Sequence, residues 1–189
     1  MPLADAARTY NVCQNCNPPV IDVASIPQNT GELYRVNVAG IKKASEADVS
    51  RMLNAEVVGH IDGDTVRVRI VNTPVGLSVV ETIRLLGVDT PEISHTNQEA
   101  QHFGEEASNF TRLRLLGRTV YLAFDWDFRD RYGRLLAYIY TGSGRCFNAE
   151  LVQQGFAYAY LRFPFKFMEE FAALEQDAKR QERGLLASP

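Results

Sequence analysis

The sequence predicts an α+β protein in which five short strands close into a small barrel and three helices are inserted between or after them. Runs that alternate apolar and polar residues recur between turn-forming residues from position 56 onward. Other stretches repeat apolar residues every three or four positions, as helices do. The length of 189 residues, 46% of them hydrophobic, suffices for one good core. Closure would remove the edges that five short strands otherwise expose.

Residues 1–55 are predicted to form an amino-terminal extension, followed by a barrel domain at 56–184 and a short tail at 185–189. Positions 1–31 are rich in Asn, Pro and Ala without periodicity, which favours an extended arm. Residues 32–41 alternate in part and favour one strand. The stretch 45–48 resembles a capping box and predicts a short helix to Asn54. This extension is too small to fold alone, so we expect it to pack on the barrel domain.

The barrel domain begins with a predicted three-stranded meander. Val57, Val58 and Ile61 suggest a first strand, which Asp62 and Gly63 end as a hairpin turn. Residues 65–71 alternate, which predicts one buried face and one charged face; the first carries Val66, Val68 and Ile70, the second Arg67 and Arg69. A turn at 72–76 leads to a third strand at 79–88.

The rest of the domain alternates helices and strands. A helix is predicted over 98–116, ending at Gly117, with a core-facing stripe of Ala100, Phe103, Ala107, Phe110 and Leu113. Strands follow at 118–124 and 135–140. Asn148 is predicted to cap a short helix ending at Gly155. A last helix at 166–183 should face inward with Phe167, Phe171, Leu174 and Ala178. Five strands with these helices favour a barrel of the OB type.

Charge and cysteine content constrain the function only loosely. The net charge of −3 does not indicate a protein that binds nucleic acid. However, 13 of the 15 basic residues from position 56 onward are arginines. This bias toward arginine has two equally good explanations. Arginine makes bidentate contacts to phosphate, and a bias in genomic composition would have the same effect. The sequence contains no run of about 18 apolar residues, the length that a membrane-spanning helix needs. Cys13 and Cys16 could be a redox pair, a disulfide or half of a zinc site, whereas Cys146 is predicted to be buried.

The stretch 84–92 is the first candidate site. Arg84 lies in an apolar strand, and beyond Val88 the chain changes to polar residues that include Asp89 and Glu92. Strict alternation would place Arg84 and Asp89 on opposite faces, so a shared site requires a bend, and Gly87 is the expected place for it. A rigid turn that holds two carboxylates next to a guanidinium suits a hard cation and a phosphate.

Three further clusters could join this site. Asp64 shares the parity of Val66 and Val68, so its carboxylate should point to the interior and needs a partner, a metal ion being one candidate. Residues 130–134 place Arg131 and Arg134 around a tyrosine and a glycine, which suits either a phosphate clamp or a loop of internal ion pairs. Tyr158, Tyr160 and Arg162 share a strand face, which suits base stacking, although core packing explains most such tyrosines.

Four stretches, taken in order, resemble the staphylococcal nuclease (thermonuclease) family: 61–66 (IDGDTV), 84–92 (RLLGVDTPE), 130–134 (DRYGR) and 137–140 (AYIY). The resemblance covers about residues 56–184. It implies an OB barrel with three helices, and a calcium-dependent nuclease that hydrolyses DNA and RNA phosphodiester bonds to leave 3′-phosphate ends.

The resemblance also implies roles for individual residues. Asp64, Asp89 and the backbone carbonyl of Thr90 would bind Ca²⁺, which prefers hard oxygen ligands. Glu92 would act as the general base or position the attacking water. The remaining assignments concern the nucleic acid: Arg84 and Arg134 would hold the scissile phosphate, Arg131 and Tyr132 a neighbouring terminal phosphate, and Leu136 and Tyr160 would flank the nucleotide.

Some positions depart from the family pattern. The loop 94–99 lacks the lysines of the staphylococcal enzyme, and Arg162 stands where a second tyrosine is expected, so we expect weaker attraction to DNA. The alternative is a nucleic-acid-binding or scaffold module that keeps the fold without catalysis. Such modules lack several of the five key residues, all of which are present here: Asp64, Arg84, Asp89, Glu92 and Arg134. The resemblance further implies a monomer that acts in the periplasm or after secretion, although the first residues lack the pattern of a signal peptide.

Overall fold

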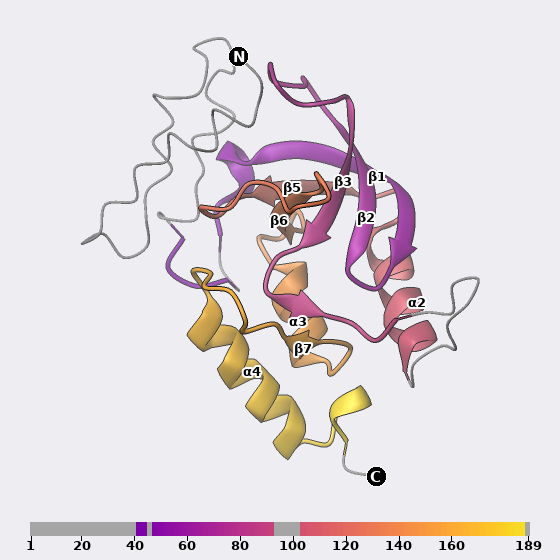
Figure 1. Cartoon of the computed structure of the whole chain (residues 1–189), viewed down its shortest axis with the longest axis vertical. Helices are drawn as coiled ribbons and strands as arrows, with labels where there is room; N and C mark the ends of the chain where they lie inside the picture. The colour runs from indigo at the N-terminus through magenta and orange to yellow at the C-terminus, as the bar shows by residue number, and fades with distance from the viewer. Residues whose placement is uncertain (1–40, 45–46, 93–102, 188–189) are drawn as a thin grey trace.

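The structure, a computed structural model, describes residues 41–44, 47–92 and 103–187, and its centre is a closed five-stranded barrel (Figure 1). The strand order is β1-β2-β3-β6-β5, with only β3 and β6 parallel among these pairs. The strands are β1 (Leu53–Asp62), β2 (Thr65–Ile70), β3 (Val80–Leu85), β5 (Thr119–Ala123) and β6 (Leu135–Tyr140). The predicted OB-type barrel with three helices is confirmed.

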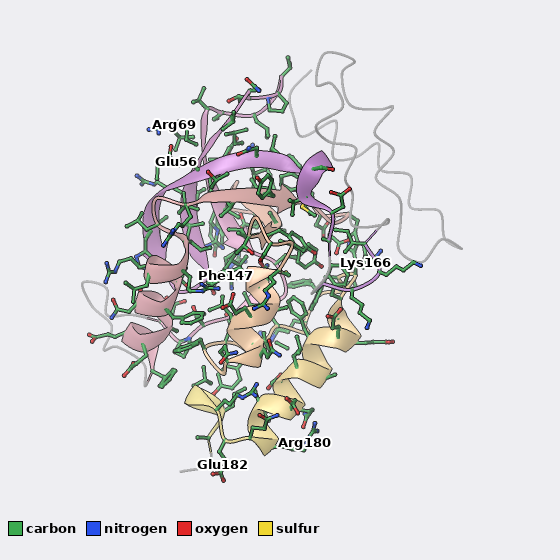
Figure 2. All side chains as sticks on the ribbon, turned by 180° about the vertical axis from the view of Figure 1, so that it is seen from behind. Glu56, Arg69, Phe147, Lys166, Arg180 and Glu182 are labelled. Atoms are coloured by element: carbon green, nitrogen blue, oxygen red, sulfur yellow. The ribbon has the colours of Figure 1, made fainter. Side chains whose placement is uncertain are left out.

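The β1–β2–β3 meander follows the alternation of the sequence. Val66, Val68 and Ile70 of β2 are buried, whereas Arg67 and Arg69 are exposed, as predicted. β1 is long for a small barrel, and its pairing with β2 shifts register twice, which lets one strand bend around the core. Figure 2 shows Glu56 and Arg69 together on the outer surface, where they form an ion pair of 3.0 Å.

The segment before the barrel differs from the prediction. Asp48 caps only a three-residue 3-10 helix, η5 (Val49–Arg51), by accepting a hydrogen bond of 2.9 Å from the Ser50 amide. The predicted helix to Asn54 is wrong, because Leu53 and Asn54 already belong to β1 and pair with β5. Pairing across the barrel outweighs the local capping signal. Most of the predicted strand at 32–41, and Cys13 and Cys16, lie outside the described residues.

Helix α2 (Gly104–Leu115) packs against β1 through a partly polar face. The predicted stripe is wrong at Leu113, of which 67% is exposed, and the buried face carries Ser108 and Thr111 instead. Thr111 donates 2.6 Å to the Gly63 carbonyl, and Ser108 Oγ lies 3.0 Å from His60 Nε2. These hydrogen bonds satisfy the polar groups that the helix buries. Gly117, with a φ of +72°, ends the helix as predicted, and the predicted part at 98–102 lies outside the described residues.

Helix α3 (Phe147–Gln153) begins one residue before Asn148, so the predicted capping role of that residue is wrong. The Asn148 side chain is fully buried and instead joins three segments. Its Oδ1 accepts from the Ile139 amide at 2.9 Å, and its Nδ2 donates to the carbonyls of Leu86 and Ala137 at 2.9 and 3.1 Å. Cys146, next to the helix, is buried as predicted.

Helix α4 (Met168–Arg180) covers α3, and the 3-10 helix η6 (Gly184–Leu186) follows it. Phe171 and Ala178 face the core as predicted, while Phe167 is buried just before the helix begins. Figure 2 shows Phe147 deep inside the molecule at the start of α3, and Figure 1 shows α4 extending below the barrel. In the part of the chain that the structure describes, no helix is long and apolar enough to cross a membrane.

Candidate functional site

A glycine turn after β3 directs the chain out of the barrel. β3 ends at Leu85, Gly87 has a φ of +76°, and β4 (Val88–Asp89) pairs with β7 (Tyr158–Ala159) in a separate two-stranded sheet beside α3 (Figure 1). The predicted irregularity at Gly87 is confirmed, whereas the single strand over 79–88 is wrong in its last part. A Cβ atom on Gly87 would lie 2.7 Å from Phe165, so backbone and packing both require glycine.

The same turn encloses the Arg84 guanidinium. Nη1 of Arg84 donates to the carbonyls of Leu85 and Val88 at 3.0 and 2.9 Å. Only 16% of the side chain is exposed. The chain therefore uses its own backbone, bent at Gly87, to fix the orientation of this guanidinium.

Two carboxylates meet at the other end of this guanidinium. Nη2 of Arg84 lies 2.9 Å from Asp64 Oδ2 and 3.3 Å from Asp89 Oδ1. The two aspartates come from different parts of the fold, the β1–β2 turn and β4. Asp64 is buried, whereas 52% of the Asp89 side chain is exposed. One arginine thus bridges a hidden carboxylate and an accessible one.

Close packing holds the β1–β2 turn against the β4 segment. A Cβ atom on Gly63 would lie 2.7 Å from Oγ1 of Thr90, and the Thr90 amide donates 3.3 Å to Asp64 Oδ2. The Leu85 amide donates 2.8 Å to the Asp64 carbonyl. Asp64 is therefore fixed to β3 and to Thr90 at once.

Burial has the largest effect on the pKa of both carboxylates. It raises the pKa of Asp64 to about 6, although the neighbouring Arg84 guanidinium acts in the opposite direction. Burial likewise raises the pKa of Asp89, again opposed by Arg84. Two carboxylates around one guanidinium leave a negative site, so an added cation would favour their ionised forms.

The carboxylate pair offers only oxygen donors to a cation. Its donors are hard oxygens, which Ca²⁺ prefers. Across the described ranges, no three His, Cys, Asp or Glu side chains gather where they could hold a metal ion. A cation between Asp64 and Asp89 would therefore take its other ligands from backbone carbonyls, water or a phosphate. Thr90, buried beside Asp64, stays a predicted carbonyl ligand.

A cavity of about 920 Å³ opens beside this cluster. The predicted site residues that line it are Arg84, Asp89, Arg131, Tyr132, Arg134, Leu136 and Tyr160. Leu136 pairs in register with Arg84 across the parallel β3–β6 contact, which brings the 130–136 segment to the site. Asp64 and Thr90 contact these residues but are not among those that line the cavity.

The loop before β6 is braced by one aspartate. Asp130 accepts from the Arg134 Nε at 2.6 Å, and its other oxygen accepts from the amides of Tyr132 and Arg134. Nη2 of Arg131 donates 2.6 Å to the Tyr132 hydroxyl. The ion pair between Asp130 and Arg134, which belongs to the alternative reading of this loop, is present and orients Arg134 beside the cavity, whereas Arg131 is held by its hydrogen bond to the Tyr132 hydroxyl.

Glu92 is not among the cavity-lining residues, and its proposed role stays a prediction. It is exposed at the end of a described segment. Its carbonyl would lie 2.5 Å from a Cβ atom on Gly104, so the chain after β4 passes tightly against the start of α2. This contact ties the position of Glu92 to that of the helix.

The cavity also contains residues that the sequence did not single out. Trp126, Arg129, Phe163 and Pro164 line it. Arg162, which the sequence did single out, lines it as well, and its charge opposes the burial that raises the pKa of Asp89. The one tryptophan of the chain, next to an aspartate in a polar loop, was the available signal. The aromatic pair around Pro164 was another.

A closed five-stranded barrel with arginines, carboxylates and exposed aromatics around one cavity defines an OB-fold protein with a candidate ligand site. Comparison with known proteins identifies the family within this fold class. A family model described as a staphylococcal nuclease homologue matches residues 82–188. The chain belongs to the staphylococcal nuclease family.

Individual relatives agree with this assignment. A thermonuclease of Staphylococcus hyicus is 34% identical over 148 residues, which cover 78% of this chain and 80% of the relative. A thermonuclease of Staphylococcus intermedius is 36% identical over 148 residues, with 77% and 83% covered. Endonuclease YncB of Bacillus subtilis is 38% identical over 132 residues, with 68% and 59% covered. These relatives support a nuclease activity and a nucleic-acid substrate.

Proposed function

We propose that this protein is a calcium-dependent nuclease that hydrolyses phosphodiester bonds of both DNA and RNA and leaves 3′-phosphate ends. The supporting observation is that Arg84, which bridges Asp64 and Asp89, lines the same cavity as Arg134. Two fixed guanidiniums beside a carboxylate pair suit a phosphodiester, because they can stabilise charge on its oxygens while the carboxylates hold a cation.

In this proposal each side chain has a defined task. Asp64, Asp89 and the Thr90 carbonyl hold calcium, which when bound polarises a phosphoryl oxygen and neutralises its charge. Arg84 and Arg134 orient the scissile phosphate and stabilise the negative charge that grows on its equatorial oxygens. The backbone contacts of Arg84 mean that its guanidinium needs little reorganisation during the reaction.

The remaining tasks concern water and the substrate chain. Glu92 takes a proton from the attacking water or positions it. Arg131 and Tyr132 hold a neighbouring terminal phosphate, and Leu136 and Tyr160 flank the nucleotide. Tyr132 is exposed and Leu136 is partly buried, which suits the rim and the floor of such a subsite respectively.

Digestion of single-stranded DNA and RNA, with Ca²⁺ and with EGTA, tests the proposal. Cleavage should require calcium on both substrates. The DNA products should prime a polymerase only after phosphatase treatment, because a 3′-phosphate blocks extension. Binding of the strand without calcium-dependent cleavage would instead identify a non-catalytic binding module.

Two variants test the roles of the side chains. Glu92→Gln and Arg134→Ala should each lose about 100-fold or more in rate while they remain folded. Glu169→Gln, an exposed substitution in the first turn of α4, is the matched control and should cleave like the parent protein. Full activity in either site variant would refute the role assigned to that residue.

A further inference from the structure

We propose that the ion pair between Glu81 and Arg129 is a positioning device, which places Arg134 relative to Arg84 so that one phosphate contacts both guanidiniums. The two members, called the buried pair below, would not touch the substrate and would act through the loop that carries Arg134. This inference rests on the proposed function in taking a phosphodiester as the ligand of the two arginines. It adds two positioning residues to the site.

The buried pair begins on the strand that carries Arg84. Glu81 shares the inward face of β3 with Ile83 and Leu85, and only 7% of its side chain is exposed. Nη2 of Arg129 donates 2.8 Å to Oε1 of Glu81, and Nη1 donates 3.1 Å to Oε2. A bidentate contact of this kind fixes the direction of a guanidinium as well as its distance.

Arg129 passes this fixed position on to the loop 130–134. Its Nη1 also donates 2.6 Å to the carbonyl of Gly133, the residue before Arg134. The backbone of Arg129 forms an antiparallel bridge with Leu135, so the residues on either side of the loop lie next to each other at its base. One side chain therefore connects β3 to both ends of the loop.

The other contacts of the loop leave this connection necessary. β6 begins at Leu135 and pairs there with β3, which holds the end of the loop (Figure 1). The contact of 2.6 Å between Asp130 and Arg134 lies inside the loop and would move with it. The buried pair ties the start of the loop to the strand of Arg84. Placement matters because a shift of about 1 Å in a reacting group can cost roughly 100-fold in rate.

Direct contact of Arg129 with a phosphate is the competing explanation, because this residue lines the cavity. The hydrogen bonds of its guanidinium favour positioning. Nη1 donates to both Glu81 and Gly133, and Nη2 donates to Glu81. The carboxylate that faces the guanidinium also offsets its attraction for a phosphate. Only 24% of the Arg129 side chain is exposed.

Replacement of both partners separates positioning from stability. Glu81→Met combined with Arg129→Met removes both charges together, so it leaves no buried charge unpaired and should keep the stability near that of the parent protein. The exposed Ser78 amide and Gly133 carbonyl, which each lose a partner, can bind water instead. The kcat on single-stranded DNA should fall about 10- to 100-fold, and KM should change less than about threefold. Parent-like kcat in the folded double variant would overturn the inference.

A second bidentate pair provides the matched control. Arg114 donates 2.8 and 3.0 Å to Glu150 and joins α2 to α3, and neither residue lines the cavity. Arg114→Met combined with Glu150→Met should therefore cleave like the parent protein, with urea titrations confirming that both double variants are folded. A loss of kcat in this control as large as that caused by removing the buried pair would overturn the inference.

The decisive test repeats the replacement in the Arg134→Ala background. If the buried pair acts through Arg134, its removal there should change kcat less than about twofold, because residues that act as a unit are not additive. The same loss in both backgrounds would show that the pair acts independently of Arg134, as a direct phosphate contact by Arg129 would, and would overturn the inference.

Hydrogen exchange tells failure of this inference apart from failure of the proposed function. The Asp130 amide donates to the Arg134 carbonyl and the Gly133 amide to the Asp130 carbonyl, both at 3.0 Å. Without the buried pair both amides should exchange about tenfold faster, in EGTA and without substrate. Faster exchange, in a protein whose parent shows no calcium-dependent cleavage, would support the positioning of the loop and refute the nuclease proposal. Calcium-dependent cleavage by the parent, with exchange and kcat unaltered in the double variant, would do the reverse.

Discussion

Nη2 of Arg84 lies 2.9 Å from Oδ2 of Asp64, and this contact joins the last turn-side residues of β3 to the β1–β2 turn. An ammonium could not keep it together with the contact to Asp89 and the two backbone carbonyls, because only a guanidinium offers donors in a planar fork. The shape of the guanidinium at position 84 is therefore as important as its positive charge.

Arg84→Lys should lower the cleavage rate by about 100- to 1,000-fold, the usual effect of removing one preorganised donor. It should also destabilise the fold by about 1–3 kcal/mol, because buried acceptors lose their donors. Arg69→Lys is the matched control, since Arg69 forms only an exposed pair with Glu56, worth about 0–1 kcal/mol. Rates and urea titrations check both effects. Equal losses of cleavage rate and stability in Arg84→Lys and Arg69→Lys would contradict the importance of the guanidinium at position 84.

Gly87→Ala should cost more stability than Gly117→Ala. Both glycines have a positive φ, +76° and +72°, so each alanine should cost about 1–2 kcal/mol of backbone strain. Only the new Cβ atom at position 87 adds a collision, with Phe165 at 2.7 Å, whereas a Cβ atom on Gly117 would meet nothing within 4 Å. Urea titrations should show the difference, and only Gly87→Ala should reduce cleavage per folded molecule. Equal stability losses would mean that Phe165 moves aside freely.

Asn148→Asp should destabilise the fold by about 3 kcal/mol or more, because a buried carboxylate cannot donate to the carbonyls of Leu86 and Ala137. Asn109→Asp on the exposed face of α2 is the control, and its effect should stay within about 0.5 kcal/mol. Chemical denaturation measures both. A small loss at Asn148 would show that this side chain does not hold the Gly87 turn, α3 and β6 together.

His60 should make stability fall in mild acid. Burial lowers the pKa of His60 below its ordinary value of 6.5, so the unfolded chain takes up the proton first as the pH falls. The contribution of His60 is therefore fully present above pH 6.5 and is lost progressively below it. His60→Gln should reduce the shift of the urea midpoint between about pH 7.5 and pH 5.5. An unaltered shift would assign the acid sensitivity to other groups.

Several features of the site could be predicted because alternation in a strand is strict. The parity of Arg84 and Asp89 demanded a bend, and Gly87 was the residue that could supply it. The inward direction of Asp64 followed from its parity with Val66 in the same way. What parity could not reveal is that the bend ends the strand and starts a new one, because the partner of β4 lies near residue 158, far along the chain.

Helical periodicity was less reliable, for a physical reason. The buried face of α2 carries Ser108 and Thr111, whose hydrogen-bond partners His60 and Gly63 belong to β1 and its turn. Hydrophobicity alone places Leu113 inside instead. Asn148 was misjudged for the same reason, since a buried amide with three backbone partners resembles a helix cap in sequence. The positions of Trp126 and Phe163 at the cavity were not predicted, because residues in loops leave no periodic signal.

The parallel contact between β3 and β6 has a consequence for the order of folding. The β1–β2–β3 meander needs only neighbouring segments, whereas pairing of Ile83 with Leu135 must wait for α2 and β5, which lie between them in the chain. Contacts between distant segments form slowly, because the entropy of closing a long loop must be lost first. Arg84 belongs to the early unit and Arg134 to the late one. During refolding, the circular dichroism of the β-sheet should therefore recover before cleavage does. The recovery of cleavage would then report when the barrel closes.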